Sequence, residues 1–182
     1  MVSQGEINLN TNYQRLLCYQ KAVVIYDLTN HFCSRFVSKK DRTYDQMIQA
    51  ARSGKQNIVE GFVDMATSKE SGIKLFNVAR GSLAELAEDY NDYLRVHNLC
   101  KWDNASQNMV AMTRLGATHN DPQFFITIAE SRTDETIANM ALVLIRQAEL
   151  LIRKYIDKVS ENFSHEGGFR EQMFRIRRAK LK

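Results

Sequence analysis

The chain has 182 residues, of which 44% are hydrophobic, eight are glycine and only one is proline. This length is normal for a single domain, and the scarcity of turn-forming residues favours an all-α protein. Residues 169–182 hold six basic residues and one acidic residue, a net charge of +5, whereas the other 168 residues have a net charge of −1. No stretch approaches the roughly 20 apolar residues of a membrane-spanning helix, which excludes an integral membrane protein of that kind.

Apolar spacing predicts three long helices in the first part of the chain, over about residues 12–36, 43–63 and 68–98. Thr11 with Gln14, and Thr67 with Glu70, match capping boxes that open the first and third of these helices. The polar, basic residues 34–42 form the first predicted turn.

The third predicted helix has the clearest pattern, because its apolar residues recur at spacings of three and four. These residues are Phe76, Ala79, Leu83, Leu86, Tyr90, Tyr93 and His97. An apolar seam of about four heptads is too long to remain exposed, so the other helices must cover it. His97 on the seam, and Cys18 and Cys100, are therefore expected in or near the core.

The connection after the third helix, residues 99–133, is long for a helical bundle. It contains a predicted amphipathic helix over about 104–116, followed by a turn around Pro122. Thr133 or Asp134 then caps a last long helix, to about residue 161. We predict an antiparallel, up-down four-helix bundle over residues 12–161, with 99–133 inserted between its third and fourth helices and a basic C-terminal suffix over 162–182.

Small residues form a stripe on the second predicted helix, at Ala50, Gly54 and Gly61. A glycine inside a helix destabilises it by about 1 kcal/mol relative to alanine, which calls for a reason. The stripe indicates either close approach of another helix, or close approach of a ligand or a nucleic-acid backbone. Gly81 in the third helix also suggests a packing role.

Four carboxylates lie at helical spacing in the third predicted helix: Glu85, Glu88, Asp89 and Asp92. Like charges four residues apart repel by roughly a few tenths of a kcal/mol, so we expect cationic neighbours on another helix or another subunit. A two-metal site in a bundle needs Glu-x-x-His pairs, and none of the four histidines has a glutamate three residues before it. No zinc-ligand spacing and no nucleophile-and-base motif occurs either. We predict a protein that is not an enzyme, with no metal, no cofactor and no small-molecule substrate.

Asn57 and Glu60 are polar residues beside an apolar run. They are interpreted either as a structural hydrogen-bond pair that holds helix ends in register, or as binding residues.

The cellular location is predicted from the cysteines and the N-terminus. The three scattered cysteines favour a reducing, cytoplasmic setting, and residues 1–12 lack the basic start and apolar core of a signal peptide.

The C-terminal suffix is the segment most suggestive of function. Its basic residues include Arg170, Arg175, Arg177, Arg178 and Lys180. Guanidinium groups bind phosphate in a bidentate manner, and Phe169 and Phe174 can stack on bases or insert into a partner groove. With Arg52 and Lys55 of the second helix, these residues are the candidate contacts to nucleic acid or to a protein partner. The alternatives are a solvated amphipathic end that docks on the bundle, and binding to an anionic membrane, for which the segment is short and only modestly apolar.

Two segments, QAARSGKQNIVEG (49–61) and ARGSLAELAEDYNDYL (79–94), resemble the signatures of the bacterial four-helix-bundle proteins first noticed in intervening sequences of 23S rRNA genes. The accessory variability determinant of diversity-generating retroelements is similar to the same family. The ending EGGFREQMFRIRRAKLK resembles a subgroup with a C-terminal suffix. The resemblance implies an antiparallel four-helix bundle, often a ring-like homopentamer. For the retroelement relative it also implies binding of nucleic acid and reverse transcriptase through a basic surface. The family usually joins its third and fourth helices tightly, whereas residues 99–133 intervene here.

Two functions follow from these patterns. The first is an oligomeric helical bundle that binds RNA, DNA or a ribonucleoprotein partner through its basic residues. The alternative is a protein-interaction scaffold whose C-terminal suffix docks on a partner protein or a neighbouring subunit.

Overall fold

The computed structural model describes residues 12–166, and the regular structure of this part of the chain is all helical, with no strand. The prediction of an all-α protein is confirmed. A short 3₁₀ turn, η1 (Tyr13–Arg15), precedes the α-helices, which are α1 (Leu17–Phe36), α2 (Arg42–Asp64), α3 (Lys69–Val96), α4 (Gln107–Thr118), α5 (Pro122–Ala129) and α6 (Asp134–Glu166).

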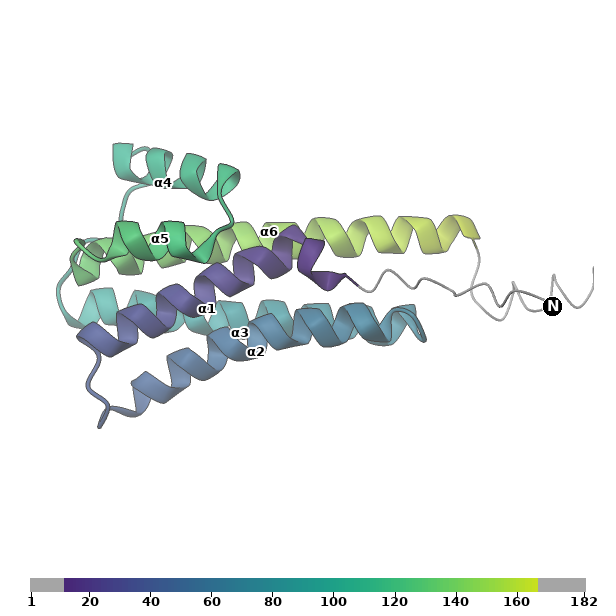
Figure 1. Cartoon of the computed structure of the whole chain (residues 1–182), viewed down its shortest axis with the longest axis horizontal. Coiled ribbons are helices and arrows are strands. Elements are labelled where there is room, and N and C mark those ends of the chain that lie inside the picture. The colour runs from purple at the N-terminus through teal and green to yellow at the C-terminus, as the bar shows by residue number, and fades with distance from the viewer. Residues whose placement is uncertain (1–11, 167–182) are drawn as a thin grey trace, which may run out of the picture.

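Four long helices lie side by side, and each runs in the opposite direction to the one before it (Figure 1). Helices α1 and α3 each pack against both α2 and α6. The two short helices between α3 and α6 lie outside this group, where α5 contacts α1 and α4 contacts α6. They form a second layer over one side of the long helices (Figure 1).

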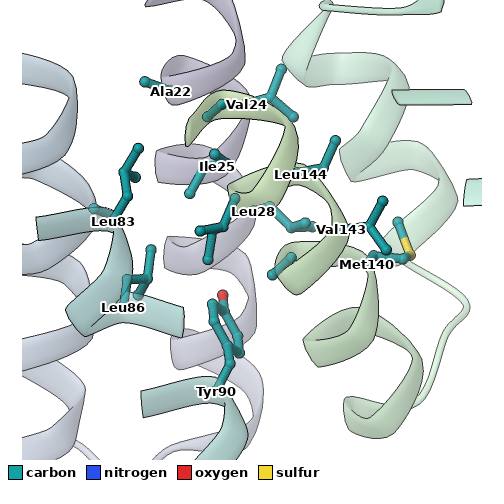
Figure 2. Close-up of a cluster of buried hydrophobic side chains, with 14 of the residues drawn as sticks. Ala22, Val24, Ile25, Leu28, Leu83, Leu86, Tyr90, Met140, Val143 and Leu144 are labelled. Carbon is teal, nitrogen blue, oxygen red and sulfur yellow. The ribbon is translucent and has the colours of Figure 1, made fainter. Parts of the chain in front are cut away.

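One part of the core lies where apolar faces of α1, α3 and α6 meet (Figure 2), and α2 adds Met47, Ala51 and Ile58 to the same core. Ile25 and Leu28 of α1 and Leu86 of α3 are fully buried there. The predicted seam of α3 is buried from Phe76 to Tyr90. The Tyr90 hydroxyl donates a hydrogen bond to Thr29 Oγ1 at 3.0 Å, so the polar atom at this depth has a partner.

Several predicted helix ends differ from those in the structure. Helix α1 begins at Leu17, because the backbone of Leu16 is extended and separates it from η1; Thr11 of the predicted capping box lies outside the described residues. Helix α3 is capped by Ser68, whose hydroxyl accepts from the Ser71 N–H at 3.2 Å, and not by Thr67. Helix α6 continues to Glu166, beyond the predicted end at 161.

The predicted turn at Pro122 is wrong in one respect, because Pro122 opens helix α5. The Asp121 carboxylate caps this helix by accepting from the Gln123 N–H at 3.2 Å. Proline is favoured at the first helical position, where no intrahelical N–H bond is lost. The inserted connection therefore contains two helices, of which the sequence pattern predicted one.

The glycine stripe of α2 is explained by close packing on α3. A Cβ on Gly61 would lie 2.8 Å from Phe76 Cδ2 and 3.0 Å from the Gly72 carbonyl oxygen, and a Cβ on Gly54 would lie 2.9 Å from Leu83 Cδ2. The prediction of close helix approach is therefore confirmed for Gly54 and Gly61. For Gly81 the expected packing role is wrong, since no atom outside its chain neighbours and its own helix backbone lies within 4 Å of the place its Cβ would take.

Two of the three residues expected in the core lie at the surface. Cys18 is buried, but His97 and Cys100 are exposed. Helix α3 ends at Val96 and Asn98 has a left-handed backbone (φ 56°), so the chain leaves the seam just before His97 would continue it.

Candidate functional site

A groove lies between the N-terminal half of α2 and the C-terminal half of α3. It consists of two adjoining hollows, of about 610 Å³ and about 570 Å³, which share Gln46 and Asp89 in their lining. The two helices touch where the glycines lie and diverge toward the start of α2 (Figure 1). We call this feature the α2–α3 groove; it is lined by residues of the ranges 42–53 and 85–97 and, at one end, by residues 36–41.

Carboxylates outnumber basic groups in the lining of the groove. The acidic residues are Asp41, Asp45, Glu85, Asp89 and Asp92. Arg42 is the one arginine or lysine among the described residues that line it. Asp41 caps α2 by accepting from the Thr43 N–H at 2.9 Å, and this hydrogen bond lowers the pKa of Asp41. Asp45 lies in the first turn of α2, where a negative charge is favourable.

Two carboxylates on the α3 wall of the groove, Glu85 and Asp89, have no comparable partner among the described residues. Asp89 is half-buried, and burial, followed by the charges of Asp92 and Glu85, raises its pKa. Asp92 pairs at 2.8 Å with Arg95 of its own helix, where both side chains are exposed. Among the side chains described, those of residues 12–161, no ion pair joins Glu85 or Asp89 to a basic group. The groove therefore has uncompensated negative charge at its α3 wall.

Apolar and aromatic side chains form the end of the groove that lies nearest the α1–α2 turn. Val96 is 64% exposed, which is the largest exposure of any large apolar residue in the described chain. Tyr93 stacks on His97 with ring centroids 4.0 Å apart and donates from its hydroxyl to Asp134 Oδ2 at 3.0 Å. Burial and the neighbouring Asp134 carboxylate raise the pKa of Tyr93, so this hydroxyl remains a donor at neutral pH. The groove thus combines apolar surface with carboxylates, as expected for binding a cationic and partly apolar chain.

A separate cluster holds the inserted helices in place through two cations of α1. Lys21 is only 1% exposed, and its ammonium donates to the carbonyl oxygens of Gly116 and, at 2.9 Å, His119, at the C-terminal end of α4. The Arg35 guanidinium donates at 3.0 Å to the carbonyl oxygen of Ala129, at the end of α5. Cations are favourable at helix C-termini, where carbonyl groups lack intrahelical partners.

Sequence reasoning missed both of these cations. The signal for Lys21 was present, because it occupies an apolar seam position of α1, four residues before Ile25 and seven before Leu28. A lysine at such a position must find acceptors inside the protein. Arg35 lies in an exposed last turn and gave no such signal.

The structure separates the predicted binding residues. Arg52 is exposed on α2, whereas the Lys55 ammonium lies 4.0 Å from the centre of the Tyr26 ring and near the Asp27 carboxylate. Lys55 therefore contributes to the contact between α1 and α2. Five other candidates lie outside the described residues: Arg170, Arg175, Arg177, Arg178 and Lys180.

The two residues of the predicted polar pair, Asn57 and Glu60, have different surroundings in the structure. Asn57 donates to the carbonyl oxygen of Ser53, one turn earlier in its own helix, at 2.8 Å. Glu60 is exposed to solvent. The Asn57 bond thus stays within α2.

Two features of the described residues bear on the kind of site present. Among the described residues, no group of three or more histidine, cysteine, aspartate or glutamate side chains is placed to hold a metal ion. In the same part of the chain, none of the helices has the length and apolar character needed to cross a membrane.

No family model, no curated protein and no solved structure matches this chain. The resemblance of residues 49–61 and 79–94 to the intervening-sequence proteins therefore stays a prediction from the sequence. These two segments do pack on each other, since Gly54 of the first lies against Leu83 of the second.

Proposed function

We propose that this protein is an oligomeric scaffold without catalytic activity, which binds a basic segment of another polypeptide in the α2–α3 groove. In this proposal α1, α2, α3 and α6 form an antiparallel four-helix bundle, with α4 and α5 as its insertion and residues 162–182 as its suffix. The pairwise packing of the four long helices supports this architecture. The bundle would belong with the intervening-sequence proteins, and the free cysteines support a cytoplasmic location.

The observation that carries the proposal is the uncompensated charge on the α3 wall of the groove. A half-buried carboxylate next to two others is electrostatically unfavourable in the free protein. A guanidinium group placed beside Asp89 and Glu85 would remove this repulsion and form charge-assisted hydrogen bonds. Exposed apolar surface next to these carboxylates, at Val96, adds area that a partner can bury.

The test is binding of fluorescein-labelled nona-arginine, measured by fluorescence anisotropy at rising salt. We expect binding that weakens with salt and that falls about tenfold in the double variant E85Q/D89N, which keeps the side-chain shapes. The matched control is E70Q/E88Q, which removes two carboxylates from α3 outside the groove and should bind like the wild type. Equal binding by both double variants and the wild type would refute the groove as the site.

A second candidate function is binding of RNA or DNA, and the charge of residues 169–182 is the observation that favours it. Phosphate contacts by these residues, with Arg52, would give an affinity that falls steeply with salt. Gel shifts with single-stranded RNA and duplex DNA, using the full chain and the variant R175Q/R177Q/R178Q, test this function. Unchanged gel shifts in the variant would exclude the suffix as the nucleic-acid contact.

A further inference from the structure

We infer that the α2–α3 groove of one copy receives the basic segment 169–182 of a second copy of this chain. The inference rests on the proposed function and names the partner of the same groove. It follows from the chemistry of the groove, the composition of this segment and the distance between the groove and the end of α6.

The groove sets three requirements for its occupant. Positive charge must lie beside Glu85 and Asp89, which have no ion-pair partner in the described chain. Apolar side chains must cover Val96 and the neighbouring part of the groove. The segment must also have few carboxylates, because the lining already has an excess of them.

Residues 169–182 meet all three requirements. They hold six basic residues and one acidic residue, whereas the rest of the chain has a net charge of −1. Apolar residues alternate with the basic ones, among them Phe169, Met173, Phe174 and Ile176. Charge complementarity thus pairs the most basic segment of the chain with an acidic groove of the same chain.

The geometry favours two copies for the segment as a whole, because only the residues from Arg175 onward can reach the α3 wall of the groove in their own chain. The rings of Phe76 and Tyr155 have centroids 4.8 Å apart, so these residues lie at one level along the helices. Glu166 lies eleven residues beyond Tyr155, and Asp89 lies thirteen residues from Phe76 toward the opposite end. At 1.5 Å per residue, Glu166 and Asp89 are about 36 Å apart along the helix axes, and Glu166 and Glu85, the nearest lining residue of α3, are about 30 Å apart. Phe174, eight residues after Glu166, reaches at most about 29 Å even in a fully extended chain.

The residues before Arg175 therefore cannot reach the carboxylates of α3 in the groove of their own chain. Phe169, Arg170 and Phe174 are among them, so a chain closing on itself would leave out most of the apolar part of the segment. A second copy has no such limit. Because the donating segment and the receiving groove are different surfaces, the contact is head-to-tail, and repeated copies close into a ring or extend as a filament.

The test mixes two full-length variants, each with one half of the contact removed. The groove variant E85Q/D89N keeps the basic segment, and the suffix variant R175Q/R177Q/R178Q keeps the groove. We expect the wild type to associate in sedimentation velocity, each variant alone to associate about tenfold more weakly, and their mixture to recover a one-to-one complex. The control E70Q/E88Q should associate like the wild type.

Three results would overturn the inference: a wild type that stays monomeric at all concentrations, variants that associate normally, or a mixture that recovers no complex. The last result indicates that the segment binds its own chain or another partner. The nona-arginine measurement separates this inference from the proposed function. If the peptide binds the groove and the mixture does not assemble, the scaffold proposal stands and only the second copy is wrong as the partner.

Discussion

The two ends of the α2–α3 contact differ in the size and the charge of the residues that meet there. Near the turn between these helices, Gly61 and Gly72 allow the two backbones to approach until a Cβ would clash. At the other end, polar and acidic residues such as Gln46 and Asp89 line two hollows. The glycine end is complete within one chain, whereas the acidic end offers surface and charge to another molecule.

The largest effect should come from filling the closed end. In Gly72→Ala, the new Cβ would lie 2.7 Å from the Gly61 carbonyl oxygen and 3.0 Å from the Met65 backbone nitrogen, so backbone must move. We expect the free energy of unfolding to fall by about 2–3 kcal/mol, measured by urea denaturation. A loss below about 0.5 kcal/mol, the size of an ordinary surface effect, would contradict close backbone packing.

Lys21 sharpens the comparison, because it is a buried charge whose partners lie within the chain, unlike Asp89. In Lys21→Met, the carbonyl oxygens of Gly116 and His119 lose their donor. We expect a loss of about 2 kcal/mol in the free energy of unfolding at neutral pH, with faster hydrogen exchange in residues 107–129. Unchanged exchange in these residues would show that Lys21 does not hold the inserted helices.

Lys21 also predicts a pH dependence. Burial lowers the pKa of Lys21 from 10.5 to about 8. Between these two values the unfolded chain binds more protons at this site than the folded chain, so stability rises with pH in this window. The difference in unfolding free energy between the wild type and Lys21→Met should therefore increase from pH 8 to pH 10.5. A constant difference would contradict the lowered pKa.

A smaller effect of opposite sign is expected at Gly81, where a Cβ would meet no atom within 4 Å beyond its chain neighbours and its own helix backbone. Gly81→Ala should raise the free energy of unfolding by about 0.5–1 kcal/mol, because alanine favours the helix and restricts the unfolded chain. The free energy of unfolding of Gly81→Ala and of Gly72→Ala should be measured together by urea denaturation, because both glycines lie in α3 and differ in how closely α2 approaches them. A lower free energy of unfolding for Gly81→Ala would mean that another part of the protein packs against this face of α3.

The smallest effect is expected at the open end. Asp89→Asn removes a charge that burial and two neighbouring carboxylates disfavour, so we expect stabilisation by about a few tenths of a kcal/mol. The free energy of unfolding should be measured with the R175Q/R177Q/R178Q substitutions also present, so that binding of the basic segment in the groove does not contribute. Because the pKa of Asp89 is raised in the folded chain, the gain should vanish as pH falls through that pKa. A net loss at neutral pH would indicate that Asp89 has a stabilising partner.

The sequence predicted the long helices well because each buries one continuous seam, as Phe76, Leu83 and Tyr90 do in α3. The close approach of α2 and α3 was also predictable, since Gly54 and Gly61 lie seven residues apart on one face of α2. Helix α5 was missed because proline is common both at the first position of a helix and in turns. Only the capping residue Asp121 before Pro122 distinguishes the helix start from a turn.

The groove could be predicted only in part. The repulsion among Glu85, Asp89 and Asp92 was evident from their spacing. Whether these carboxylates line a hollow together with residues of α2 depends on how far the two helices diverge. That divergence is a property of tertiary packing and has no local sequence pattern. The contact of Lys55 with Tyr26 was not predicted for the same reason, because it joins two helices.

The central claim is that a cationic chain binds between α2 and α3, and nuclear magnetic resonance tests it most directly. Nona-arginine is titrated into the ¹⁵N-labelled full chain while backbone amide shifts are followed. We predict that the largest shifts fall in residues 42–53 and 85–97, which line the groove, and that E85Q/D89N greatly reduces them. Shifts confined to other surfaces, or equal shifts in the variant, would contradict the claim.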